Sequence, residues 1–313
     1  MKSSRLPGSA AQALRLDVAP AIRPFGLSRL ASLWTLYVLT LRQHLHGKRW
    51  MVMGGMFLLC AGLVILVRTT SPDVPVLTLE FVFAFLFIPQ AILPLLALVY
   101  ASGIVRDEQE EQTMTYLLIR PIPKWALYTV KLLAMLTTTV VLTTALTALL
   151  YAAIYVGADT EGKNVPLRCL QAASIHALAV VAYCCLFGLI SLFTKRALIV
   201  GVLYALVFEG LLANMPFSIR LATVIYYTRL IAYRTLSFVI SVPLGTPANR
   251  WQETHDIAAE FWQFDVKRDP GLREHPQIQA CVTVLLVASL VCTVVAAFVF
   301  SVREFHVKTP EKD

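Results

Sequence analysis

The sequence predicts an all-α polytopic membrane protein with six transmembrane helices. Of its 313 residues, 58% are hydrophobic and only 15% are charged, whereas a soluble domain carries about 25% charged residues. The mean hydropathy is +0.69. Several apolar runs reach the roughly 20 residues that a helix needs to cross a hydrocarbon core about 30 Å thick. Three helical elements outside the spans complete the predicted fold: an N-terminal interfacial helix, a cytoplasmic helix between spans two and three, and an extracytoplasmic element between spans five and six.

The N-terminal part divides into a tail and an amphipathic helix. Residues 1–26 are rich in Pro, Ser, Ala and Arg and predict a mobile cytoplasmic tail. From 27 to 46, apolar residues recur at three- and four-residue steps, which predicts a helix lying in the membrane interface. Trp34, Tyr37 and Arg42 are its expected interface residues. A cytosolic helix packed on a partner is the alternative, but the immediate continuation into the first span favours the interface.

The six predicted spans cover residues 51–67, 79–102, 127–156, 174–193, 197–213 and 278–302. Pro89 and Pro94 are expected to kink the second span. Glu80 lies at the predicted outer end of that span, where its carboxylate is expected to reach water. The third span is rich in Thr, whose hydroxyls bond to their own helix or to a neighbour. A structural role for these hydroxyls is favoured, and a polar substrate path stays open.

The region between spans five and six is interrupted by arginines. Arg220, Arg229 and Arg234 lie within the otherwise apolar residues 217–243. Each Arg costs about 2.5–3.5 kcal/mol at mid-membrane, whereas each large apolar residue contributes only about 0.3–0.6 kcal/mol. We therefore expect an amphipathic or re-entrant helical element, with 217–276 on the extracytoplasmic side. Most Lys and Arg then fall in cytoplasmic segments, both termini are cytoplasmic, and 303–313 forms a second cytoplasmic tail.

Several function classes find little support in the sequence. The net charge of +8 is explained by the positive-inside rule, so we expect no nucleic-acid partner. The segment GADTEGKN at 157–164 departs from a phosphate-binding loop, because Asn164 replaces Ser or Thr and no strand precedes it. The cysteines lack metal-binding spacing, and we expect no metal and no cofactor on this chain. Cys169 and Cys281 lie near the outer ends of spans, and a disulfide between them is left open.

Three ionisable side chains in or near the spans need separate interpretation. Glu209 lies within the fifth span near its outer end, and an intramembrane acid is a candidate polar site. A snorkelling or arginine-paired structural role for Glu209 is at least as well supported. His176 and His306 lie near predicted span ends and have no catalytic companion in the sequence. The chain is therefore not expected to be an enzyme.

The cytoplasmic segment 107–125 reads DEQEEQTMTYLLIRPIPKW. Its acidic residues fill the first turn of a predicted helix, where negative charge suits the helix dipole. Met114, Leu117 and Leu118 share one face of that helix, and Pro121 ends it at 120. Four acidic residues argue against a position on an anionic lipid leaflet. A protein partner that contacts this helix is the better explanation.

This segment resembles the loop between spans two and three of type-2 ABC transporter permeases. The residues that match the family pattern are Thr113, Leu117, Leu118, Pro121, Lys124 and Lys131. Gln112 and Val130 depart from it, because the family usually has Gly at both places. The plan of six spans with an N-terminal interfacial helix and an outer element is also similar to that family.

The resemblance implies a single transmembrane permease domain over 27–302, located in the plasma or inner membrane. The chain would be the permease subunit of an ATP-binding cassette exporter. It would form the pathway as a homo- or heterodimer, and ATP would be bound by separate ATPase subunits. The helix 107–120 would then be a coupling helix, and the residues implied to contact the ATPase are Glu108, Glu111, Thr113, Leu117, Leu118, Pro121 and Lys124.

Two other classes remain as alternatives. A self-sufficient channel or secondary carrier would need polar groups deep in the spans, and Glu209 and the Thr-rich third span are the candidates. A membrane-embedded enzyme has the least support, because the spans contain no recognisable catalytic constellation.

Overall fold

The computed structural model describes residues 25–47, 49–72, 74–104, 123–158, 164–194, 196–214, 218–244, 251–262, 264 and 275–302. Within this part of the chain, six helical segments are long and apolar enough to cross a membrane. They are Arg49–Thr70 (α3), Val76–Ala101, Lys124–Tyr155 (α8), Val165–Phe193 (α9), Ala197–Asn214 and Ile278–Val302 (α13). The predicted all-helical membrane class and the six spans are therefore confirmed.

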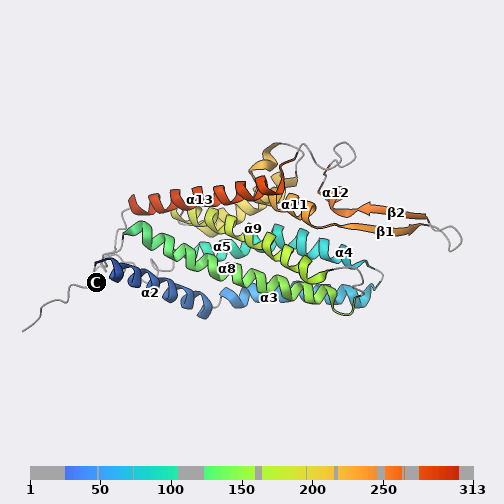
Figure 1. The fold of residues 1–313 in the computed structure, drawn as a ribbon, viewed down its shortest axis with the longest axis horizontal. Coiled ribbons are helices and arrows are strands. Elements are labelled where there is room, and N and C mark those ends of the chain that lie inside the picture. The colour runs from blue at the N-terminus through green and yellow to red at the C-terminus, as the bar shows by residue number, and fades with distance from the viewer. Residues whose placement is uncertain are drawn as a thin grey trace, which may run out of the picture.

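The spans form an elongated bundle with α9 near its centre (Figure 1). Helix α9 packs against α8, α13 and α5 (Leu93–Ala101), which is the last part of the second span. Glycine allows close approach at two contacts: a Cβ on Gly188 would lie 2.9 Å from the Tyr128 hydroxyl, and one on Gly201 would lie 2.1 Å from the Leu98 side chain. Small residues at helix contacts are typical of membrane bundles, because tight packing replaces the hydrophobic effect there.

The second span is irregular. It starts as α4 (Val76–Leu79), continues as a 13-residue π-helix, η1 (Glu80–Ile92), and ends as α5. Pro89, one of the two prolines expected to distort this span, lies inside the π-helix, and Pro94 lies in the first turn of α5. Proline has no backbone N–H to donate, which weakens regular α-helical bonding around it. Wide helical turns of this kind occur frequently at functional sites.

The fourth span begins earlier than the sequence analysis predicted. Helix α9 starts at Val165, although residues up to 173 were expected to form a loop. Pro166 suits the first turn of a helix, because its missing N–H would be unpaired there anyway. The additional turns place Arg168 on the helix rather than in a loop. A partner for that cation inside the bundle, described below, explains why the helix can extend through it.

The fifth span is composite, and short turns then connect it to a further helix. It consists of α10 (Ala197–Tyr204), a π-helix, η2 (Ala205–Leu211), and a 3₁₀ turn, η3 (Leu212–Asn214). A second 3₁₀ turn, η4 (Ser218–Ala222), leads to α11 (Val224–Thr235). Helix α11 packs against α9, α13 and η1. At 12 residues it is too short to cross the membrane.

A two-stranded hairpin that the sequence analysis did not predict follows α11. Strands β1 (Val239–Leu244) and β2 (Trp251–Asp256) are antiparallel, with Val239 opposite Asp256 and Leu244 opposite Trp251. A short helix, α12 (Ile257–Phe261), comes directly after β2. The hairpin projects from one end of the bundle, and α2 (Phe25–His46) lies at the opposite end (Figure 1). The hairpin and α2 thus mark opposite ends of the bundle.

Several predicted elements lie outside the described residues. These are the N-terminal tail up to residue 24, the segment 105–122 with the predicted cytoplasmic helix, the segment 265–274 and the C-terminal tail 303–313.

Candidate functional site

Helix α2 is attached along the third span. Leu36 and Thr40 of α2 are buried, and the Tyr37 hydroxyl donates a hydrogen bond of 3.0 Å to Thr137 Oγ1 on α8. The Trp34 side chain is 67% exposed and stacks on Tyr37 with ring centroids 5.5 Å apart. Arg42 is exposed. One face of α2 therefore packs on α8 and the other is exposed, and a position of this helix in the membrane interface stays a prediction.

The same end of the bundle carries both flanks of the segment 105–122. Ile104 is buried at the end of the second span, and Pro123 caps α8, which starts at Lys124. The 32 residues of α8 have a length of about 48 Å, which exceeds the hydrocarbon thickness by about 18 Å. Lys131, one of the residues that match the family pattern, is buried. The predicted contact residues Glu108, Glu111, Thr113, Leu117, Leu118 and Pro121 lie outside the described residues.

A charged cluster lies at the opposite end of the bundle, around Glu80. The Glu80 side chain is completely buried, so the expectation that its carboxylate reaches water is wrong. Its oxygens accept hydrogen bonds from the Tyr151 hydroxyl at 2.7 Å and the Tyr155 hydroxyl at 2.6 Å. Arg168 forms a salt bridge with Glu80, with Nη2 3.0 Å from Oε2. A buried carboxylate is stable only with such paired charge and full hydrogen bonding.

The Glu80 cluster also reaches the outer region. Arg168 Nη2 lies 3.3 Å from the Ser237 carbonyl oxygen, and the guanidinium lies 5.7 Å from the centre of the Phe238 ring. Phe238 in turn packs edge-on against Phe81, the neighbour of Glu80. The cluster therefore joins spans two, three and four to the segment that leads into the hairpin.

His176 was expected near a span end. It lies inside the bundle instead. It is fully buried. Its Nδ1 lies 3.0 Å from Thr147 Oγ1 on α8, and its Nε2 lies 2.8 Å from the carbonyl oxygen of Ala84 in the π-helix. Thr147 thus has a structural role that connects α8 to α9. The imidazole is held between three spans by these two polar contacts.

Glu209 caps α11. The carboxylate is buried and accepts hydrogen bonds from the backbone N–H groups of Val224 at 3.1 Å and Ile225 at 3.0 Å. These are the first two residues of α11, whose N–H groups have no partner within the helix. A negative charge at this position is also favoured by the helix dipole. The acid from span five thus replaces the usual side-chain cap, since Thr223 makes no cap hydrogen bond.

Arg229 connects α11 to two spans. It is 6% exposed, and its Nη1 donates to Asn214 Oδ1 at 2.9 Å. Its Nη2 donates to Gln90 Oε1 at 3.3 Å. Gln90 belongs to the π-helix of the second span, ten residues further along the chain than Glu80. Helix α11 is therefore packed beside the second span.

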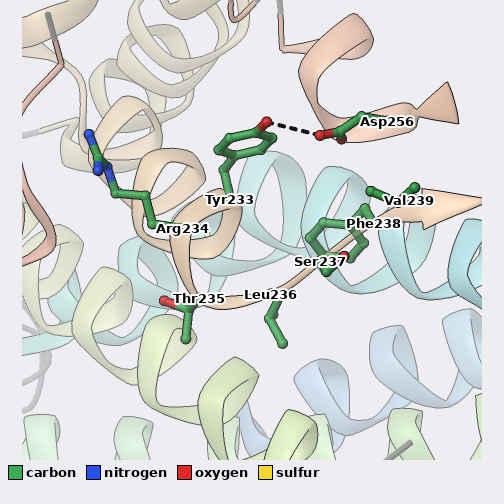
Figure 2. A pocket seen from close by; sticks show the side chains of 8 residues that line it. All are labelled: Tyr233, Arg234, Thr235, Leu236, Ser237, Phe238, Val239 and Asp256. Carbon is green, nitrogen blue, oxygen red and sulfur yellow. Dashed lines mark hydrogen bonds between the residues drawn. The ribbon is translucent and has the colours of Figure 1, made fainter. Parts of the chain in front are cut away.

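A pocket of about 300 Å³ lies between the end of α11 and the start of β1 (Figure 2). In Figure 2, Tyr233 points toward Asp256 and donates a hydrogen bond of 2.9 Å to its Oδ2. The Asp256 Oδ1 accepts from the Ala259 N–H at 3.1 Å and so caps α12. Burial, the hydrogen bond to Asp256 and the charge of Asp256 raise the pKa of Tyr233 to about 12. The hydroxyl is therefore protonated at neutral pH and ties the hairpin to α11.

The described residues contain no group of three or more His, Cys, Asp or Glu side chains that could hold a metal ion. All six cysteines are free thiols. The disulfide between Cys169 and Cys281 that the sequence left open is therefore not formed.

Comparison with known proteins agrees with this architecture. A family model described as "ABC-2 family transporter protein" matches residues 43–212, which is more than half of the chain and extends from the end of α2 into the last turn of the fifth span. The chain belongs to the ABC-2 transporter family. The family resemblance predicted from the sequence is thereby confirmed. No curated protein matches the chain.

Membership of this family makes the chain a multi-pass permease component of an ABC transporter. It is a membrane transport component and not itself catalytic. The six spans provide the membrane part, and the residues 107–125 lie within the matched range.

Sequence reasoning missed most members of the polar clusters. Arg168 was assigned to a loop, and Tyr151, Tyr155, Gln90 and Asn214 were not considered. A signal was nevertheless present for Arg168: it and Glu80 carry opposite charges at the predicted outer ends of neighbouring spans. Opposite charges at the same depth in a membrane are expected to pair.

Proposed function

We propose that this permease works as an exporter driven by two separate ATPase subunits, with two permease chains forming the pathway. The observation that carries the proposal is the family match over 43–212, which includes the cytoplasmic segment with its acidic residues and Leu pair. The permease would be located in the plasma or inner membrane with both termini on the cytoplasmic side. The second permease chain would be another copy or a paralogue.

We assign the ATPase contact to Glu108, Glu111, Thr113, Leu117, Leu118, Pro121 and Lys124. The two flanks of this segment support the assignment, because Ile104 is packed in the bundle and Pro123 leads directly into the long helix α8. A segment held at both ends can transmit a movement of its partner. Helix α2 lies against α8 through Tyr37 and Thr137, so it would move with the same span.

Helix α8 offers a mechanical route from this contact to the far end of the bundle. Its N-terminus follows the contact segment, and its last turns carry Tyr151 and Tyr155, which bind Glu80. Closure of the ATPase subunits would favour one arrangement of the spans over the other through this rigid element. The Glu80 cluster would keep spans two, three and four together during the change.

The polar groups that a self-sufficient carrier would use are engaged in packing. Glu209 is bound to the N-terminus of α11, and Thr147 is bound to His176. Glu80 is bound to Arg168 and two tyrosines. These contacts favour the ATP-driven permease over a carrier that works alone.

Purification of the intact complex tests the proposal. The tagged chain, extracted from native membranes in mild detergent, is expected to retain an ATPase subunit in a one-to-one ratio. The eluate is expected to hydrolyse ATP, and orthovanadate is expected to inhibit it, whereas the chain expressed alone has no activity. Recovery of the chain without any ATP-binding polypeptide from such membranes would contradict the proposal.

A further inference from the structure

A groove of about 370 Å³ lies on the outside of the bundle between the last turns of α3 and α8. Its lining residues are Ile65, Arg68, Thr69, Ala153 and Val156. The walls are mainly apolar, and the Ile65 side chain is 52% exposed. The small side chain of Ala153 leaves the space between the two helices open. The groove has polar groups, Arg68 and Thr69, near the end of α3 only.

Arg68 carries a charge that is only partly compensated. Its Nη1 donates a hydrogen bond of 2.7 Å to the Ile154 carbonyl oxygen and another to the Val156 carbonyl oxygen, at the C-terminal end of α8. Carbonyl groups at a helix end lack partners within the helix and carry about half a negative charge. In the part of the chain that the structure describes, no carboxylate pairs with Arg68. Arg68 is thus the charged side chain among the described residues that line the groove.

The depth of the groove in the membrane follows from the length of α3. Trp50, an aromatic residue typical of the membrane boundary, lies 18 residues before Arg68 on the same helix. This separation corresponds to about 27 Å along the helix axis, close to the hydrocarbon thickness of about 30 Å. Arg68 and Thr69 thus lie at the level of lipid headgroups, and Ile65 and Ala153 lie at the level of acyl chains.

We propose that this groove binds an anionic phospholipid. The phosphodiester would accept hydrogen bonds from Arg68 nitrogens other than Nη1, which already donates to α8. The start of one acyl chain would fill the apolar space beside Ala153. The shape and the charge of the groove match an amphiphile with one negative charge, because the cation and the apolar walls are arranged along the membrane normal. The groove lies at the C-terminal end of α8, whereas the proposed ATPase contact precedes the N-terminus of that helix.

Lipid retention measured by native mass spectrometry tests the proposal. The full-length chain, purified in detergent, is titrated with phosphatidylglycerol and separately with phosphatidylcholine of the same acyl chains. Wild-type protein is expected to bind the anionic lipid more tightly. Arg68→Gln is expected to weaken phosphatidylglycerol binding roughly fivefold, which is the contribution of one arginine at a membrane surface. Arg196→Gln, which removes an exposed arginine elsewhere, is the matched control and is expected to change nothing.

A second variant tests the groove without altering charge. Ala153→Leu fills the space between the helices and is expected to reduce lipid retention, whereas Ala148→Leu, at an exposed position one turn away on α8, is not. This variant also serves if the loss of the α8 contact in Arg68→Gln prevents folding. Added glycerol phosphate is not expected to displace the lipid. Equal retention of both lipids, or retention unchanged in Ala153→Leu, would overturn the proposal.

Discussion

Replacing Arg168 with Met is expected to destabilise the permease by about 3 kcal/mol. Removing one partner of a buried ion pair typically costs about 3–5 kcal/mol, because the remaining charge stays buried without compensation. The lower end applies here, since the Arg168 side chain is 15% exposed and two tyrosines still bind Glu80. The measurement is the free energy of unfolding in mixed micelles, followed by circular dichroism.

A second substitution distinguishes the charge from the packing. Glu80→Gln in the Arg168→Met background removes the unpaired charge, and the double variant is expected to recover at least half of the lost stability. Arg220→Met is the matched control, because the Arg220 guanidinium lies over the Tyr226 ring and forms no ion pair with the described carboxylates. It is expected to change stability by less than about 1 kcal/mol. An Arg168→Met protein as stable as wild type would show that Glu80 is neutral or otherwise compensated.

Replacing Leu117 and Leu118 together with Asp is expected to release the ATPase subunit while the permease still inserts and folds. Two leucines on one helix face provide the apolar part of the proposed contact. The Asp carboxylates that replace them would be removed from water at the centre of the interface without a partner, which is unfavourable. Loss of central contacts of this kind costs about 2 kcal/mol or more. ATPase recovered per permease in a pull-down is therefore expected to fall at least about tenfold.

The control for this variant is Leu117→Met with Leu118→Met, which keeps the apolar face and is expected to retain the ATPase. Membrane insertion and unfolding of the Asp variant are measured in parallel and are expected to match wild type. A one-to-one yield of ATPase with the Asp variant would refute the assignment of these residues.

The spans were predictable because length and apolar composition are local properties. A run such as 278–302, without a charge, has no other stable environment than a bilayer. The rejection of a span at 217–243 followed from three arginines, and the structure has α11 there as a short helix beside the bundle. The family resemblance also rested on a local pattern of neighbouring residues.

Apart from the opposite charges of Glu80 and Arg168, the polar clusters were not predictable, because they join residues far apart in the sequence. Glu80 and Arg168 are 88 residues apart. The hydrophobic periodicity of the two helices does not indicate that these residues meet. The start of the fourth span was missed for the same reason, since Arg168 looks like a loop residue until its partner is known. His176 and Ala84 are 92 residues apart. The imidazole forms a hydrogen bond with the backbone oxygen of Ala84, and since every residue has such an oxygen, the sequence does not mark this one as a partner.

The candidate functional sites also differ in whether their residues are neighbours in the sequence. The residues of 107–125 could be proposed from sequence because an acidic turn, an apolar face and a proline stop are consecutive. The role of Glu209 required the structure, because its partners are backbone N–H groups of α11. The hairpin that follows α11 also escaped prediction, since β1 and β2 are short and stabilise each other only as a pair.

Photo-crosslinking from the contact segment tests the central claim most directly. A benzophenone amino acid is placed at position 117 in the full-length permease, in native membranes, and a second variant carries it at position 290, a lipid-exposed site on α13. Illumination at 117 is expected to join the permease to a second polypeptide that azido-ATP also labels, and illumination at 290 is not. A crosslink from 117 only to lipid or to another copy of the permease would contradict the claim that this segment contacts an ATPase.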